Sequence, residues 1–156
     1  MPEPTAGNPD TFDLRIPGDL HFVGSARRFL LSVLRTFEIP ESTRDEVGLV
    51  LTELCNNSIE HGARGSRSPL DIRIELSAGE LRLRIVGRHL EGLDAAQLHD
   101  AFQQAKLGED KFSERGRGLF LVATLMDDVR VEGDPRNGLV VDTVRYLDAR
   151  RKGRAS

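Results

Sequence analysis

The segment of residues 42–62 is the sequence feature that most constrains how this chain can fold. At about 100° per residue, a helix here places Glu53 and Asn57 about 40° apart, with Glu60 about 20° to the other side of Glu53. Apolar residues fall on a neighbouring arc of the same helix: Val47, Val50, Leu51 and Leu54. The segment is therefore predicted to be an amphipathic helix with an apolar seam and, beside it, a ridge of two carboxylates and one amide.

This polar ridge has two interpretations that the residues alone leave open. Polar side chains along one edge of a helix are ordinary for a solvated face. Asparagine and glutamate one turn apart can also hold a hydrated Mg²⁺ ion and its phosphates together, and a glutamate can accept a proton from an attacking hydroxyl. Under the second interpretation, residues 53–60 form part of a nucleotide site.

Two motifs resemble those of a known family. Residues 53–61 read Glu-Leu-Cys-Asn-Asn-Ser-Ile-Glu-His. They resemble the asparagine box of the GHKL ATPase superfamily, where Glu-x-x-x-Asn lies on the helix that floors the nucleotide pocket. The likeness is strongest to the bacterial anti-sigma factor serine kinases, whose box is close to Glu-Ala-Cys-Thr-Asn-Ala-Val-Glu-His. Residues 114–122, Glu-Arg-Gly-Arg-Gly-Leu-Phe-Leu-Val, resemble that family's second glycine box, Gly-x-Gly-Leu-x-Leu.

The resemblance implies a cofactor, ATP with Mg²⁺, and a role for individual residues. Glu53 is implied as the catalytic base and Asn57 as the Mg²⁺ ligand. The implied nucleotide-binding residues are Asn57, Glu60, His61, Gly92, Gly116, Arg117, Gly118, Leu119 and Phe120. Glycines that open a helix also suit a phosphate on physical grounds, because backbone N–H groups then face the ligand with no Cβ in the way. His61, at the last turn of its helix, either orients the pocket edge or complements the negative end of the helix dipole.

The chain departs from the family at the first glycine box, Asp-x-Gly-x-Gly, whose aspartate hydrogen-bonds the adenine amino group. Residues 85–94 read Ile-Val-Gly-Arg-His-Leu-Glu-Gly-Leu-Asp. Gly87 stands in place of the aspartate, and Gly92 matches a box glycine only with one residue inserted before it. Weak ATP binding is therefore predicted, because a charge-assisted hydrogen bond to adenine is lost.

Composition restricts the class of protein. With 156 residues, of which 38% are hydrophobic, the chain is sized for one domain with an ordinary core. A formal charge of -3 and the lack of a long basic stripe argue against a nucleic-acid binder. The single cysteine, Cys55, excludes an internal disulfide and is expected to be a packed residue. No apolar run approaches the roughly 18 residues of a membrane span, so we expect a cytoplasmic protein without membrane contact.

Periodicity elsewhere predicts the other elements. They are a strand over residues 12–16, a helix over 21–37, a hairpin over 70–85, a helix from Leu119 to about Asp127, and two strands over 129–146. Residues 95–115 are expected to hold at most a short helix and a mobile lid over the nucleotide. This order predicts an α+β fold, a two-layer sandwich with helices on one face of a mixed, mainly antiparallel sheet. The family resemblance implies the same fold.

The expected domain organisation has three parts. Residues 1–11 are expected to be a flexible lead-in, residues 12–147 the histidine kinase-like ATPase domain, and residues 148–156 a basic disordered tail.

Two functions remain open. By resemblance, the protein is a kinase that binds ATP with Mg²⁺, binds a sigma factor, phosphorylates an antagonist protein on serine and forms a homodimer. The alternative is an interaction module of the same fold that sequesters a sigma factor or its antagonist without kinase activity, and Gly87 is the residue that favours it. Arg27 and Arg28 lie off the apolar seam of their helix, where they either face solvent or contact a partner.

Overall fold

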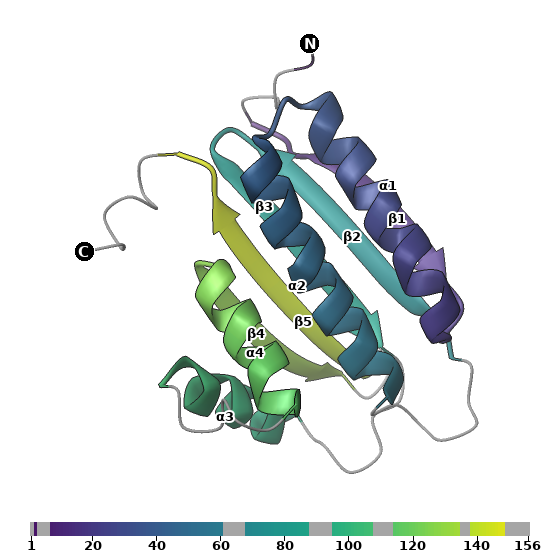
Figure 1. Cartoon of the computed structure of the whole chain (residues 1–156), viewed down its shortest axis with the longest axis vertical. Helices are drawn as coiled ribbons and strands as arrows, with labels where there is room; N and C mark the ends of the chain where they lie inside the picture. Colours follow the sequence, from purple (N-terminus) through teal and green to yellow (C-terminus); the bar gives the residue numbers. More distant parts are fainter. Residues whose placement is uncertain are drawn as a thin grey trace.

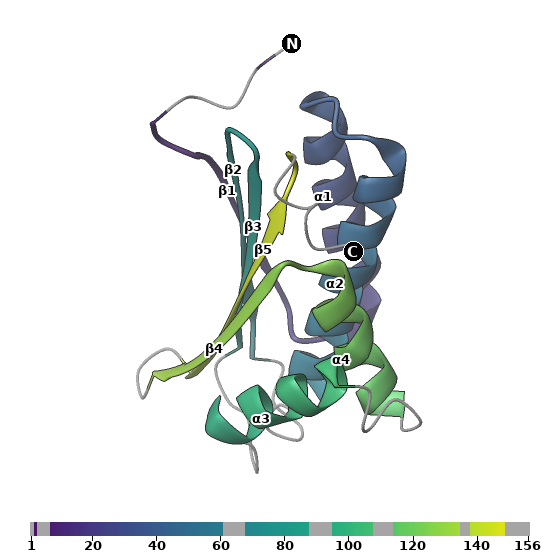
Figure 2. The same cartoon turned by 90° about the vertical axis from the view of Figure 1, so that its left-hand side faces the viewer.

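The computed structural model describes residues 2, 7–60, 68–87, 95–107, 114–134 and 138–148. These residues form two layers, a twisted sheet and a set of helices that cover one of its faces (Figure 1), and Figure 2 shows the two layers edge-on. The predicted α+β sandwich is therefore confirmed.

The sheet contains five strands in the described part of the chain. They are β1 (Asp10–Ile16), β2 (Leu70–Ser77), β3 (Glu80–Gly87), β4 (Asp128–Asp134) and β5 (Gly138–Tyr146), in the spatial order β1-β2-β3-β5-β4. All four pairings between them are antiparallel, so the sheet has no parallel pair among these strands. The predicted hairpin closes through Ala78 and Gly79, and Gly79 has a φ of 75°, a conformation that favours glycine.

Four α-helices accompany the sheet in the described residues. They are α1 (Val23–Thr36), preceded by a 3-10 turn at Leu20–Phe22, then α2 (Glu41–Glu60), α3 (Ala95–Lys106) and α4 (Glu114–Leu125). The predicted start of the last helix at Leu119 is wrong, because α4 begins at Glu114 and contains both glycines of the second motif. Glutamate and arginine are good helix formers, and they extend the helix through glycines that read as a turn in the sequence.

The core lies between α2 and the inward side of the central strands. The apolar seam of α2 is buried as predicted: Val47, Val50, Leu51 and Leu54. Cys55 is buried beside it. Alternate residues of β2 and β3 meet it from the sheet, and they are 2% exposed or less: Leu70, Ile72, Ile74, Leu76, Leu81, Leu83 and Ile85. Burial of this seam fixes the rotation of α2 about its axis, so the ridge of Glu53 and Asn57 lies at the margin of the core.

Arg27 and Arg28 lie outside the apolar seam of α1, and Arg27 has a structural role. Arg27 is half-buried, and its Nε would lie 3.1 Å from a Cβ added at Gly48 of α2. The side chain of Arg27 therefore lies across the glycine where α1 and α2 pack together. Arg28 is exposed and donates a hydrogen bond to Ser25 Oγ at 3.0 Å.

Candidate nucleotide site

Three elements meet at one end of the molecule and bring the two sequence motifs together. They are the C-terminal half of α2, the N-terminal half of α4 and the end of β3 at Gly87. The helices α2 and α4 pack against each other and run in opposite directions (Figure 1). The end of α2 that carries Asn57 therefore lies beside the start of α4, where backbone N–H groups are not used within the helix.

Glu53 and Gly118 form the contact that joins the motifs. A Cβ added at Gly118 would collide with Oε2 of Glu53 and lie 3.2 Å from its Cδ. The carboxylate of Glu53 therefore lies against the backbone of α4 within its first two turns, on the positive side of the helix dipole. Gly118 is required here for the close approach of a carboxylate, and the first-turn N–H groups of α4 come before it in the chain.

Asn57 lies one turn beyond Glu53 on the same helix. Its side chain is half-buried, and its Nδ2 atom is buried without a hydrogen-bond partner in the described part of the chain. A buried polar atom without a partner is rare in folded proteins and calls for an explanation. A ligand oxygen that binds at the amide would supply the missing partner.

Gly87 ends β3 directly against α2. A Cβ at this position would lie 3.5 Å from Cβ of Ser58 and 3.4 Å from Cδ2 of Leu70. Both distances are ordinary van der Waals contacts, so there is room here for a Cβ atom. Gly87, which the resemblance implies stands in place of the family's adenine-binding aspartate, thus borders the helix that carries Asn57.

The other predicted site residues are less closely grouped. Glu60 is exposed at the end of α2, and Arg117 is exposed on α4. The side chain of Leu119 is 3% exposed and belongs to the hydrophobic core, against which Phe120 also packs. Gly116 lies in the first turn of α4. His61 and Gly92 lie outside the described residues.

Cys55, the third residue of the first motif, is buried in the core. Its burial raises the pKa of the thiol to about 12. The thiol therefore stays protonated at neutral pH, as expected for a packed residue and not for a nucleophile.

Sequence reasoning missed a buried arginine behind the site. Arg145 of β5 is 5% exposed and points to the helix side of the sheet. It forms an ion pair with Glu46 of α2 and donates a hydrogen bond to the carbonyl oxygen of Leu125, the last residue of α4. A signal was present in the sequence, because residues 139, 141, 143 and 145 alternate inward and the last is charged.

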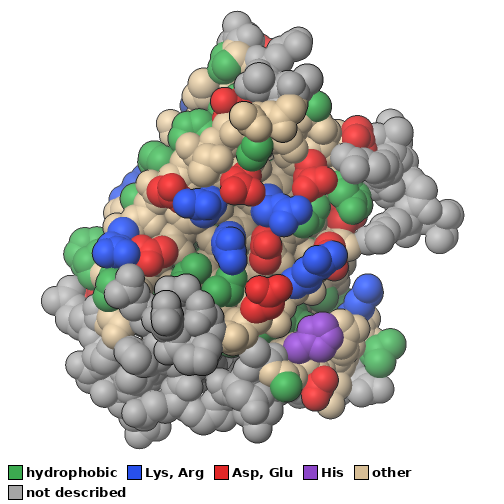
Figure 3. Space-filling model, turned by 180° about the vertical axis from the view of Figure 1, so that it is seen from behind, with side chains coloured by type: hydrophobic (Ala, Val, Ile, Leu, Met, Phe, Trp, Pro, Cys, Tyr) green, Lys and Arg blue, Asp and Glu red, His purple; other side chains and the backbone are tan. Residues whose placement is uncertain are grey.

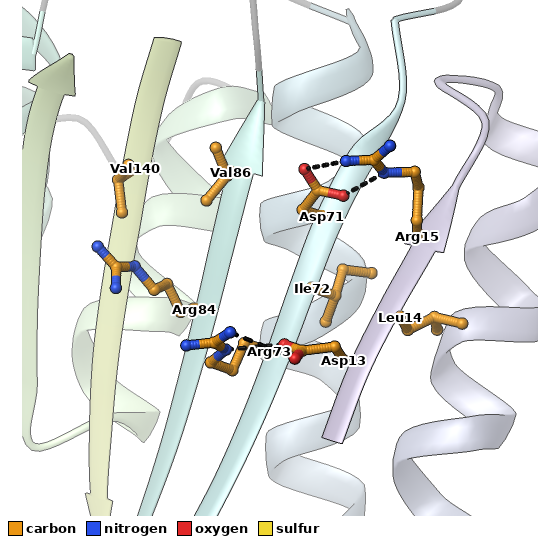
Figure 4. A pocket seen from close by; sticks show the side chains of 9 residues that line it. All are labelled: Asp13, Leu14, Arg15, Asp71, Ile72, Arg73, Arg84, Val86 and Val140. Carbon is orange, nitrogen blue, oxygen red and sulfur yellow. Dashed lines mark hydrogen bonds and ion pairs between the residues drawn. The ribbon is translucent and has the colours of Figure 1, made fainter. Parts of the chain in front are cut away.

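A hollow of about 550 Å³ lies on the opposite face of the sheet and contains none of the predicted site residues. Figure 4 shows it between two ion pairs, Arg15–Asp71 and Arg73–Asp13, with Val86 and Val140 beside Arg84. Acidic and basic side chains are interspersed over the middle of this face (Figure 3). Such paired charges give a solvated face, and the hollow is separated by the sheet from the residues of the two motifs.

Over residues 16–144 the chain matches the histidine kinase-like ATPase domain family, and it belongs to that family. Among named relatives, it is similar to the serine-protein kinase RsbW of Bacillus subtilis, with 26% identity over 155 residues. The match covers 92% of this chain and 90% of that protein.

Two solved structures have the same fold. One is in the SiaB–SiaC complex of Pseudomonas aeruginosa, with a TM-score of 0.65 at 16% identity over 86% of this chain and 87% of that one. The other contains the RsbU and RsbW domains of a Mycobacterium tuberculosis protein, with a TM-score of 0.63 at 14% identity over 88% of this chain. Only 32% of that longer chain is matched. Within the described residues, no helix combines the length and apolar character needed to cross a bilayer.

Proposed function

We propose that this protein is a cytoplasmic ATP-dependent serine kinase of the anti-sigma factor type. The observation that carries the proposal is the contact between Glu53 and Gly118, because it joins the asparagine box and the second glycine box in one place. Membership of the histidine kinase-like ATPase domain family supports nucleotide binding. Similarity to proteins named serine-protein kinase RsbW supports serine as the acceptor residue.

The residues at this place fit ATP with Mg²⁺. The amide of Asn57 offers an oxygen of the kind that Mg²⁺ prefers, and its buried nitrogen lacks a partner among the described residues. The start of α4 offers free backbone N–H groups and the positive end of a helix dipole, which suit phosphate oxygens. When bound, ATP supplies the phosphoryl group and Mg²⁺ neutralises part of the phosphate charge.

Within this arrangement Glu53 is the proposed general base. Its carboxylate accepts the proton of the acceptor serine hydroxyl, directly or through a water molecule. The absence of a Cβ at Gly118 lets this carboxylate lie against the backbone of α4. Phosphoryl transfer depends mainly on positioning and charge neutralisation, so a base beside the start of α4 suits the reaction.

The proposed partners are a sigma factor, which the protein sequesters, and an antagonist protein, which it phosphorylates. A homodimer is proposed by analogy with the family alone. These partners make the protein a switch, because phosphorylation of the antagonist decides which of the two it holds.

One observation favours a second function, a module that binds these partners without catalysis. Gly87 borders α2 at the place of the adenine-binding aspartate and has no side chain that could bind the base. A site without this contact is expected to hold ATP about 10–100-fold more weakly.

The test is calorimetric titration with ATP in the presence and absence of Mg²⁺, followed by transfer of labelled phosphate to a co-encoded antagonist. Kinase function predicts weak, Mg²⁺-dependent binding and phosphoserine on the antagonist. Tight binding of the antagonist with no ATP binding at millimolar concentration assigns the non-catalytic module instead.

A further inference from the structure

A buried cation connects the two helices that carry the motifs. The Nη1 atom of Arg145 lies 2.6 Å from Oε2 of Glu46 on α2 and 2.5 Å from the carbonyl oxygen of Leu125 at the end of α4. The arginine itself extends from β5, where it pairs with Leu81 of β3. One side chain thus contacts the sheet layer and both motif helices.

The contacts of Arg145 lie at the same distance along each helix from the contact between Glu53 and Gly118. Glu46 precedes Glu53 by seven residues on α2, and Leu125 follows Gly118 by seven residues on α4. Seven residues of helix span about 10 Å. Because the helices run in opposite directions, α4 is fixed to α2 at two levels about 10 Å apart, once through Arg145 and once through the contact of Glu53 with Gly118.

The chemistry of Arg145 suits a residue that joins the end of α4 to α2. A cation at the C-terminus of a helix interacts favourably with the negative end of its dipole, and Leu125 is the last residue of α4. Carbonyl groups in the last turn of a helix lack partners within it, so the guanidinium also satisfies one of them. A charge buried to this extent requires such partners, and Glu46 supplies the opposite charge from α2.

We propose that Arg145 is a positioning residue for the nucleotide site. By fixing the end of α4 against α2, it sets the tilt and the axial position of α4. Gly118 is thereby kept against Glu53, and the first-turn N–H groups of α4 remain aimed beside Asn57. This inference rests on the proposed nucleotide binding and adds the residue that keeps the site assembled from a distance.

The test compares Arg145→Met, Arg145→Lys and Glu46→Gln with the wild type. Methionine keeps much of the aliphatic length but removes the charge and the donors, whereas lysine keeps the charge. Ile16→Ala is the matched control, because Ile16 is 5% exposed on the edge strand β1, which β2 and β3 separate from β5. It destabilises the core without removing a contact between α2 and α4.

Two measurements are made well below the melting temperature of every variant: ATP affinity by calorimetry with Mg²⁺, and hydrogen exchange of the backbone amides of residues 116–125. Arg145→Met is expected to weaken ATP binding about tenfold or more and to speed exchange in α4 relative to β2 and β3. Arg145→Lys is expected to recover part of both effects, and Glu46→Gln to show a smaller loss. Ile16→Ala is expected to change ATP affinity by less than about twofold despite its lower melting temperature.

ATP affinity of Arg145→Met equal to that of the wild type would overturn the proposal. So would an equal loss in Ile16→Ala at a matched melting temperature, because the effect would then follow stability alone. If the wild type itself binds no ATP, the proposed kinase function fails, and hydrogen exchange still decides the role of Arg145. Unchanged exchange in α4 of both Arg145→Met and Glu46→Gln would show that the arginine does not position that helix.

Discussion

The carboxylate of Glu53 on α2 lies so close to the backbone of Gly118 on α4 that no side chain fits between them. These two residues are 65 positions apart in the sequence, and each belongs to a different motif. A glycine is needed at position 118 because of this neighbour, since the residue lies inside a regular helix where alanine is intrinsically more stable.

This relationship predicts that Gly118→Ala separates activity from stability. Alanine in a helix is favoured over glycine by about 0.5–1 kcal/mol, and the colliding atom is the mobile end of a glutamate side chain, so the melting temperature should stay the same or rise slightly. The displaced carboxylate should lower phosphoryl transfer about a hundredfold. Thermal denaturation and a labelled-phosphate assay on the same preparation measure the two effects.

Gly24→Ala is the control for that experiment. Gly24 lies in α1, and a Cβ there would meet only the end of Arg28, at 3.7 Å. It should leave transfer unchanged. A large fall in the melting temperature of Gly118→Ala would show that the rest of α4 cannot accommodate the extra atom, and that the carboxylate is fixed in place.

A second prediction concerns Asn57→Ala. The amide lies at the margin of the core with an unpartnered buried nitrogen, so its removal should cost the fold little and could relieve an unsatisfied donor. ATP binding with Mg²⁺ should be lost to calorimetric detection while the melting temperature without ATP changes by only a few degrees, about the effect of 1 kcal/mol. Asn56→Ala, the neighbouring amide on the next face of α2, should retain ATP binding. A severe loss of stability in Asn57→Ala alone would make Asn57 a structural residue.

A third prediction reverses the departure at Gly87. The surroundings leave room for a Cβ, so Gly87→Asp should fold, and its carboxylate should supply the missing contact to adenine. We expect ATP affinity to rise about 10–100-fold, together with a new preference for ATP over GTP. Without nucleotide, the variant should melt at a lower temperature than the wild type, because the carboxylate is then buried without a partner.

Gly87→Ala is the matched control, since it adds the Cβ alone. It should leave affinity and base preference unchanged. If the wild type already prefers ATP strongly over GTP, another residue recognises the base. The assignment of Gly87 to the place of the adenine-binding aspartate would then be wrong.

A fourth prediction follows from the burial of Cys55, which raises its pKa from 9.0 to about 12. Below pH 9 the thiol is protonated in both folded and unfolded chains and stability is unaffected. Above pH 9 the unfolded chain loses the proton first, so stability should fall with rising pH until about pH 12. Between about pH 8 and pH 10, the wild type should lose about 1.4 kcal/mol more than Cys55→Ala in urea unfolding. An equal loss in both proteins would mean that the thiol ionises in the folded state.

Much of the fold could be predicted because its signals are local. The strict alternation over residues 70–85 fixes which faces of β2 and β3 are buried, and the seam of α2 fixes the rotation of that helix. Glu53 and Asn57 could be identified as a pair because one helix carries both. Asn-Gly at residues 137–138 likewise marked where β5 begins, and Gly138 has a φ of 80°.

The parts of the fold and of the candidate site that could not be predicted depend on packing between segments far apart in the sequence. The start of α4 was misplaced because glycines indicate a turn in the sequence, whereas here the helix is held by its contact with α2. The approach of Gly118 to Glu53 has no local signal at all. Arg145 was missed because the strand over residues 139–146 was predicted from its apolar residues. The partners of the Arg145 guanidinium lie on α2 and α4, and no local pattern indicates them.

The last prediction concerns the proposed base. Gln has nearly the shape of Glu and keeps an acceptor oxygen, but its amide is far too weak a base to take a proton from serine. Glu53→Gln should therefore bind ATP like the wild type, while transfer to the antagonist falls about 10²–10⁴-fold. Glu41→Gln is the matched control, because Glu41 lies on the same helix but is exposed at its opposite end, and it should keep the activity. Phosphoserine formed per protein, measured with labelled ATP at saturating concentration, separates turnover from affinity. Equal transfer by Glu53→Gln and the wild type would remove Glu53 from catalysis, and its contact with Gly118 would then be a packing contact between two helices.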